Sequence, residues 1–81
     1  MDLEQSKMVS RTLITVMGSE FWVEIFTRAN GKSFALTRYS PVDIIITDGL
    51  NAEDAYARHN VVLPLAVGSR ISKSMTAGNE L

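Results

Sequence analysis

Two glycine-containing dipeptides, Gly18-Ser19 and Asn30-Gly31, divide residues 12–39 into three segments with alternating apolar side chains. Gly-X is typical of a type II′ turn and Asn-Gly of a type I′ turn, and both turns join antiparallel strands. Side chains along a strand alternate between its two faces, so a two-residue turn fixes which residues share a face. The two dipeptides therefore predict a small antiparallel meander and its register.

The predicted register gathers apolar side chains on one face of this meander. In the first hairpin Val16 faces Phe21, and in the second Ile25 faces Leu36. A slip of one residue would scatter the apolar set over both faces, which favours this register. The predicted apolar face consists of Ile14, Val16, Phe21, Val23, Ile25, Phe34 and Leu36.

The opposite face is predicted to be mixed, with aromatic and charged side chains side by side. In this register Trp22 faces Tyr39 across the second hairpin. The face is too aromatic for ordinary solvated surface and too charged for ordinary core. Its predicted members are Leu13, Thr15, Met17, Glu20, Trp22, Glu24, Phe26, Arg28, Ala35, Thr37 and Tyr39.

Two interpretations compete for the segment after Ser40-Pro41. Serine followed by proline is typical of a helix start, whereas the β-branched residues within 42–47 favour a strand that ends at Asp48-Gly49. We favour the strand.

A helix is predicted to start near residue 52. Asn51 is a good N-cap, and Glu53 and Asp54 follow in the first turn, where the helix dipole favours acidic side chains. Pro64 leaves two alternatives, because it removes a backbone hydrogen bond: the helix ends near Asn60, or it continues with a kink.

These elements predict an α+β fold with a meander of three to four strands and a C-terminal helix packed on one face, although the pattern does not say which face. We expect residues 1–10 to form a flexible lead-in, 11–68 a single globular domain and 69–81 a flexible tail. The predicted strands are about 11–17, 21–29, 32–39 and 42–47.

Composition narrows the class of protein. The chain has 81 residues, a formal net charge of −1 and no cysteine. Near-neutral charge argues against a general nucleic-acid or anionic-membrane binder, and the lack of cysteine excludes disulfides and thiolate metal sites. The polar N-terminus does not resemble a signal peptide, so we expect a cytoplasmic protein without a membrane partner.

No residue pattern predicts catalysis, a metal site or a cofactor. His59 is the only histidine, and a histidine near the end of a helix is more often structural. Glu20 and Glu24 are spaced as a carboxylate pair, but Arg28 extends the same row and indicates surface charge compensation. We therefore expect no enzyme activity and no cofactor.

The aromatic residues of the mixed face are the strongest candidates for a binding site. One helix covers one side of the sheet, so the other side is left for solvent, a second copy or a partner. Trp, Tyr and Arg are enriched at protein interfaces. The predicted partner-binding residues are Trp22, Glu24, Phe26, Arg28 and Tyr39.

The leading functional hypothesis is a non-enzymatic regulatory protein that acts by protein–protein contact, alone or as a homodimer. By analogy of size, it would be a phage- or plasmid-type accessory inhibitor of a host protein or nucleic-acid machine. A first alternative is a dimeric, sheet-based nucleic-acid regulator that uses Arg28, Lys32 and Arg38. A second is a small enzyme or ligand carrier with a dimer-interface pocket around Tyr56 and His59.

Overall fold

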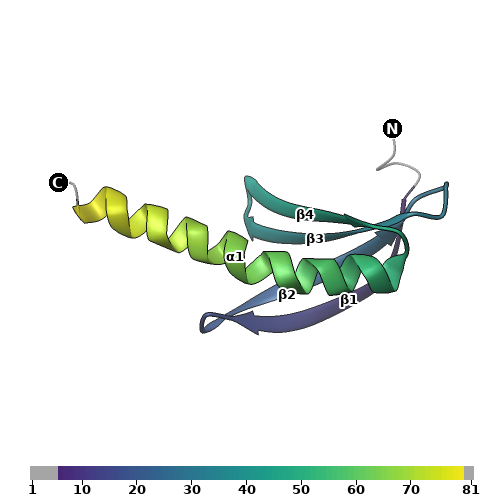
Figure 1. The fold of residues 1–81 in the computed structure, drawn as a ribbon, viewed down its shortest axis with the longest axis horizontal. Coiled ribbons are helices and arrows are strands. Elements are labelled where there is room, and N and C mark those ends of the chain that lie inside the picture. Colours follow the sequence, from purple (N-terminus) through teal and green to yellow (C-terminus); the bar gives the residue numbers. More distant parts are fainter. Residues whose placement is uncertain (1–5, 80–81) are drawn as a thin grey trace.

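The chain forms a four-stranded antiparallel sheet followed by one long helix (Figure 1). The computed structural model describes residues 6–79, with side chains as far as Lys73. The sheet order β1-β2-β3-β4 is that of a simple meander, so the predicted α+β fold is confirmed. Residues 43–47 of the segment 42–47 fall in a strand rather than a helix, and Val42 lies in the turn before it. The elements are β1 (Lys7–Val16), β2 (Ser19–Thr27), β3 (Ser33–Ser40), β4 (Asp43–Gly49) and α1 (Ala52–Asn79).

The first hairpin turns one residue earlier than predicted. Met17 and Gly18 both have positive φ, 52° and 82°, as a type I′ turn requires, so the prediction of a Gly18-Ser19 turn is wrong. The register moves by two residues, and Ile14 now pairs with Phe21. Because a shift of two preserves the faces, the apolar residues of β1 and β2 still lie together. The end of the Met17 side chain lies beside Gly68 of α1.

The second hairpin has a five-residue loop, 28–32, instead of a two-residue turn. The Arg28 and Lys32 backbones pair across it, and Gly31 takes the left-handed conformation. Phe26 therefore pairs with Phe34, and the predicted pairing of Ile25 with Leu36 is wrong.

This one-residue difference turns β3 over. Phe34 and Leu36 move to the mixed face, and Ala35, Thr37 and Tyr39 move to the apolar face. Trp22 and Tyr39 consequently lie on opposite faces of the sheet, contrary to the prediction.

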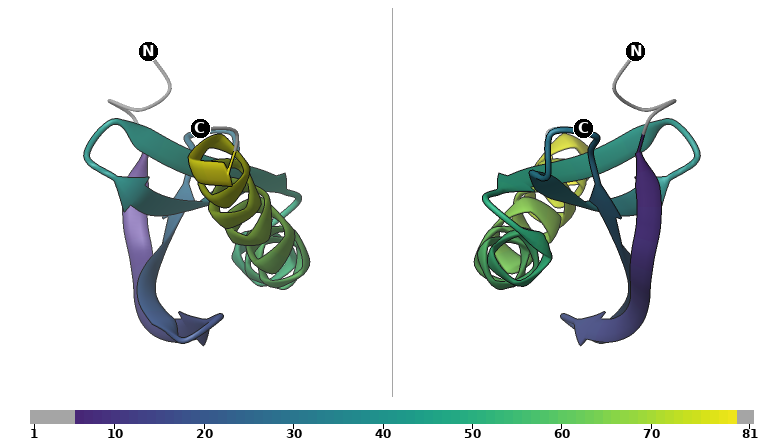
Figure 2. Two further views of the ribbon diagram at one scale, coloured as in Figure 1. Left: turned by 90° about the vertical axis from the view of Figure 1, so that its left-hand side faces the viewer. Right: turned by 90° about the vertical axis from the view of Figure 1, so that its right-hand side faces the viewer.

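The core lies between the apolar face and α1. Figure 2 shows the helix lying against one side of the sheet only. The small side chains of Ala35 and Thr37 let the helix approach β3 closely, and Leu63 is fully buried above them. The buried apolar cluster consists of Val16, Val23, Ile25, Ala35, Ile45, Ala55, Leu63 and Val67.

The start of α1 is capped as the sequence predicts. Asn51 Oδ1 accepts a hydrogen bond from the Asp54 backbone N–H at 2.8 Å, and Asp54 Oδ2 accepts one from the Leu50 N–H at 2.9 Å. The Leu50 N–H, helped by the Arg58 side chain, holds the pKa of Asp54 below its ordinary value. This reciprocal pair fixes where the chain leaves β4 and enters the helix.

The helix continues through Pro64 and reaches Asn79, past the end of the sheet (Figure 1). Arg70 anchors this second half, because its Nε and Nη2 donate to the two carboxylate oxygens of Asp43 at 2.6 and 2.8 Å. Most of the segment 69–81, where we expected a flexible tail, is therefore helical; its flexibility stays a prediction.

At the other end of the chain, β1 begins at Lys7, inside the expected lead-in 1–10. Residues 1–5 lie outside the described part of the chain. The pairing of β1 with β2 is interrupted by a bulge at Val9.

Gly49 lies in close contact with the first turns of the helix. A Cβ at this position would lie against the Ala55 backbone and only 2.8 Å from the Ala55 Cβ. A Cβ at Gly68, in contrast, would meet only the flexible end of the Met17 side chain, at 3.1 Å.

We expect Gly49→Ala to lower the free energy of unfolding by about 1–3 kcal/mol, because the helix must move to admit the methyl group. Gly68→Ala is the matched control. It should be neutral or stabilise the fold by up to about 1 kcal/mol, since alanine favours helix over glycine. Urea unfolding of both variants measures the difference, and equal effects would contradict the close-packing account.

Candidate functional site

The face of the sheet opposite α1 is not covered by any part of residues 6–79, and we call it the open face (Figure 2). Strand pairing places its residues in rows that cross all four strands. One row runs from Arg11 through Glu24 and Leu36 to Ile46. The open face comprises Met8, Arg11, Leu13, Trp22, Glu24, Phe26, Arg28, Phe34, Leu36, Arg38, Ile44, Ile46 and Asp48.

A stacked aromatic pair forms one end of the open face. The Phe26 and Phe34 rings lie 5.1 Å apart and nearly parallel. The Arg28 guanidinium covers the Phe34 ring at 4.5 Å from its centroid and forms an ion pair with Asp48 at 3.0 Å. These neighbours bury Phe34 although no helix lies above it.

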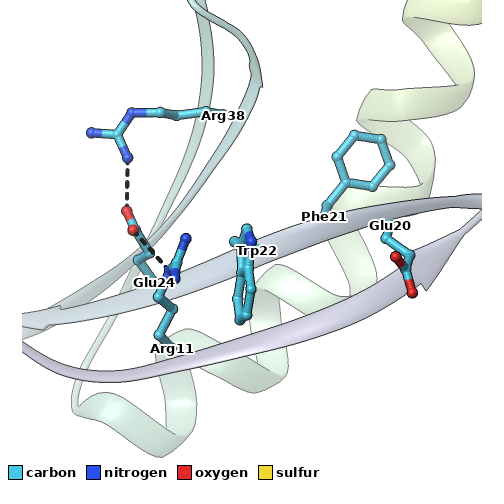
Figure 3. A pocket seen from close by; sticks show the side chains of 6 residues that line it. All are labelled: Arg11, Glu20, Phe21, Trp22, Glu24 and Arg38. Carbon is cyan, nitrogen blue, oxygen red and sulfur yellow. Dashed lines mark hydrogen bonds and ion pairs between the residues drawn. The ribbon is translucent and has the colours of Figure 1, made fainter.

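An ion-pair cluster occupies the middle of the open face (Figure 3). Glu24 is buried, and its Oε1 accepts a hydrogen bond from Arg38 Nη1 at 2.8 Å. Its Oε2 lies 3.4 Å from Arg11 Nε, and the Arg11 guanidinium in turn lies 3.8 Å from the centroid of the Trp22 ring. One carboxylate thus orients two arginines.

The cluster leaves unused hydrogen-bond donors at the surface. Each guanidinium has five N–H groups, and the side chains of Arg11 and Arg38 are about half or more exposed. They border a shallow pocket of about 150 Å³ beside Trp22. The pocket is lined by Arg11, Glu20, Phe21, Trp22, Glu24 and Arg38.

Apolar side chains surround this charged centre. Trp22 is 43% exposed and Leu13, its cross-strand partner, is 44% exposed. Ile44 and Ile46 on β4 are each 50% exposed. The open face therefore combines exposed apolar area with oriented arginines, and residues of both kinds are enriched at protein interfaces.

Four of the five predicted partner-binding residues lie together on the open face: Trp22, Glu24, Phe26 and Arg28. Tyr39 does not belong there, because β3 is turned over. Its ring stacks on Phe21 on the helix side at 5.9 Å, and Arg70 lies 5.7 Å above it.

Sequence reasoning missed Arg11 as a member of the site. The sequence did hold a signal for it: Arg11 and Leu13 are two residues apart on β1, so their side chains lie on the same side of the strand. The suggested carboxylate pair does not form: Figure 3 shows Glu20 beyond Trp22 from Glu24, whose own carboxylate is held by arginines.

His59 is fully buried between α1 and the sheet, away from the open face. Its Nε2 shares a hydrogen bond with the Thr37 hydroxyl and its Nδ1 with the Thr47 hydroxyl, both at 2.8 Å. A hydroxyl can donate or accept, so both nitrogens of the neutral ring are satisfied in either tautomer. Burial lowers the pKa of His59, because it disfavours the charged imidazolium.

The described residues contain no group of three or more histidine or acidic side chains placed to hold a metal ion. Over the same part of the chain, α1 is not apolar enough to cross a membrane. Comparison with protein-family models, with curated proteins and with solved structures found no match to this chain.

The buried His59 makes stability depend on pH. Since the unfolded chain binds a proton more readily than the folded one, stability should be constant above pH 7 and fall as the pH drops below about 6.5, the ordinary histidine pKa. Asp43 and Asp54 have lowered pKa values, so they remain ionised in this range. Thermal unfolding between pH 7.5 and 5.5 measures the effect.

His59→Gln is the control, because glutamine keeps polar atoms at the site but does not titrate. The variant should be less stable than the parent at pH 7.5 and should show little further loss at pH 5.5. An equal loss in both proteins would mean that His59 is not its source.

Proposed function

We propose that this chain is a non-enzymatic binding protein that regulates a protein partner by contact through the open face. The observation that carries the proposal is the uncovered patch in which Trp22, Ile44 and Ile46 surround arginines fixed by Glu24. Exposed apolar area of this kind favours association over full solvation. Trp and Arg are also the residues that most often dominate binding energy.

The charge pattern favours a protein partner. Arg11, Arg28 and Arg38 are balanced in part by Glu24 and Asp48 on the same face. Oriented arginines beside apolar side chains fit a surface that offers carboxylates among its own apolar residues. The shallow pocket is small for a substrate, whereas it would admit a single side chain of the partner.

Size and composition are the grounds for the biological setting that we propose. A small chain without cysteine and with near-neutral charge fits a cytoplasmic regulator. By analogy with other very small regulators, we propose an accessory inhibitor of the phage or plasmid type that blocks a host protein or nucleic-acid machine. Such a protein needs one contact surface and no active site.

The experiment is capture of a stoichiometric partner by the immobilised protein, followed by titration of that partner against variants. Trp22→Ala and Ile46→Lys should each raise the dissociation constant by about tenfold or more, the loss expected for a central interface residue. Val42→Lys is the matched control, because Val42 is 93% exposed in the β3–β4 turn, away from the row of Ile46. Unchanged binding by both open-face variants would overturn the proposal.

A second candidate function is binding of single-stranded nucleic acid, which the contact between Arg11 and Trp22 favours. Aromatic rings on an open sheet can stack bases while arginines contact phosphates. In this case Glu24→Gln should strengthen binding, because it removes a negative charge between Arg11 and Arg38.

Fluorescence anisotropy of a labelled single-stranded oligonucleotide separates the two functions. A nucleic-acid mode requires affinity that falls steeply with added salt, and quenching of Trp22 by the oligonucleotide. No binding at low ionic strength would eliminate this candidate and leave the protein-binding one.

A further inference from the structure

The outer side of α1 carries a second exposed apolar surface, separate from the open face. Leu63 is fully buried against the sheet, and Val61 and Leu65, two residues before and after it, are 69% and 72% exposed. At 100° per residue, both point away from the sheet, about 160° around the helix from Leu63. The helix therefore presents an apolar site directly opposite its own core contact.

One row of the outer surface, at four-residue spacing, is nearly symmetric about residue 63; Arg58, exposed beside this row, is paired with Asp54. Moving outward from Leu63, Val61 matches Leu65, and the next exposed pair at the four-residue spacing is Ala57 and Ser69, both small. The last pair, Glu53 and Lys73, has opposite charges. All six residues of this row are exposed: Glu53, Ala57, Val61, Leu65, Ser69 and Lys73.

We propose that a second copy of this chain binds to the outer side of α1, with the two helices antiparallel and crossing at residue 63. A twofold axis at this point sets Val61 of one copy against Leu65 of the other, and Ala57 against Ser69. The small side chains flanking the apolar centre let the helices approach closely. Rows of four-residue spacing on both helices can interdigitate, which is the commonest mode of helix packing.

Charge complementarity supports the antiparallel direction. The first turn of α1 holds Glu53, and the end of its described side chains holds Lys73, both exposed. Asp54 and Arg70 are already paired within the chain, with Arg58 and Asp43. In an antiparallel pair the acidic end of each helix lies level with the basic end of the other, and the two helix dipoles oppose. A parallel pair would bring like charges together at both ends.

The length of α1 also supports a second copy of the chain as the partner of this helix. The helix extends past the sheet (Figure 1), and Ile71, Ser72 and Lys73 are all exposed. In the antiparallel pair these three residues lie level with residues 53–55, the first turn of α1 in the second copy.

Sedimentation equilibrium of the full chain tests the proposal. We expect a dimer whose dissociation constant rises by about tenfold or more in Val61→Arg and in Leu65→Arg, because each places a charge at the apolar centre. Val42→Arg is the matched control and should leave the mass unchanged; circular dichroism checks that each variant is folded. A monomeric parent, or a dimer weakened by Trp22→Arg and not by these helix variants, would overturn the proposal.

Cross-linking tests the direction of the helices, since the chain has no native cysteine. The single variants Ala57→Cys and Ser69→Cys are mixed and oxidised. The antiparallel pair predicts disulfides between the two variants and few within either one, because identical positions lie about 18 Å apart along the helix axes. Preferential disulfides between identical positions would contradict it.

Discussion

The close approach of α1 to β3 and β4 determines the rest of this structure. The helix comes near enough for His59 to share hydrogen bonds with Thr37 and Thr47, because glycine and alanine stand at the contact between Gly49 and Ala55. Larger side chains under the helix would move it outward and leave the imidazole nitrogens without partners in a buried site. Small residues and two hydroxyls thus define the face of β3 that the helix can cover.

This contact explains which part of the fold the sequence could predict. The elements, the cap at Asn51 and the faces of β1 and β2 follow from local patterns that the structure keeps. The facing of β3 does not, because it carries apolar side chains on both sides and its loop is longer than Asn30-Gly31 alone suggests. The type of a turn depends on neighbouring residues. The face of β3 that packs under the helix depends on helix residues about twenty positions further along the chain, such as His59 opposite Thr37.

The candidate site could be predicted in part for the same reason. Trp22, Glu24, Phe26 and Arg28 lie on one strand and the loop that follows it, so alternation alone brings them to one side. Their companions come from the neighbouring strands and depend on the register. The large side chains that the helix cannot accommodate, Phe34 and Leu36, are buried instead by neighbours on the open face. The same facing of β3 therefore places small side chains under the helix and large apolar ones on the open face.

The bulge at Val9 has a consequence for how the protein behaves at high concentration. β1 is a long edge strand with exposed side chains, and its free backbone groups are a template for another strand. A bulge breaks the regular spacing of those groups, and the nearby charges of Lys7 and Arg11 repel an identical edge. At the opposite edge, Asp43 and Asp48 near the ends of β4 are ion-paired with Arg70 and Arg28, so they add little net charge there. The bulge therefore hinders strand-to-strand growth at the β1 edge, while the face of the sheet stays exposed.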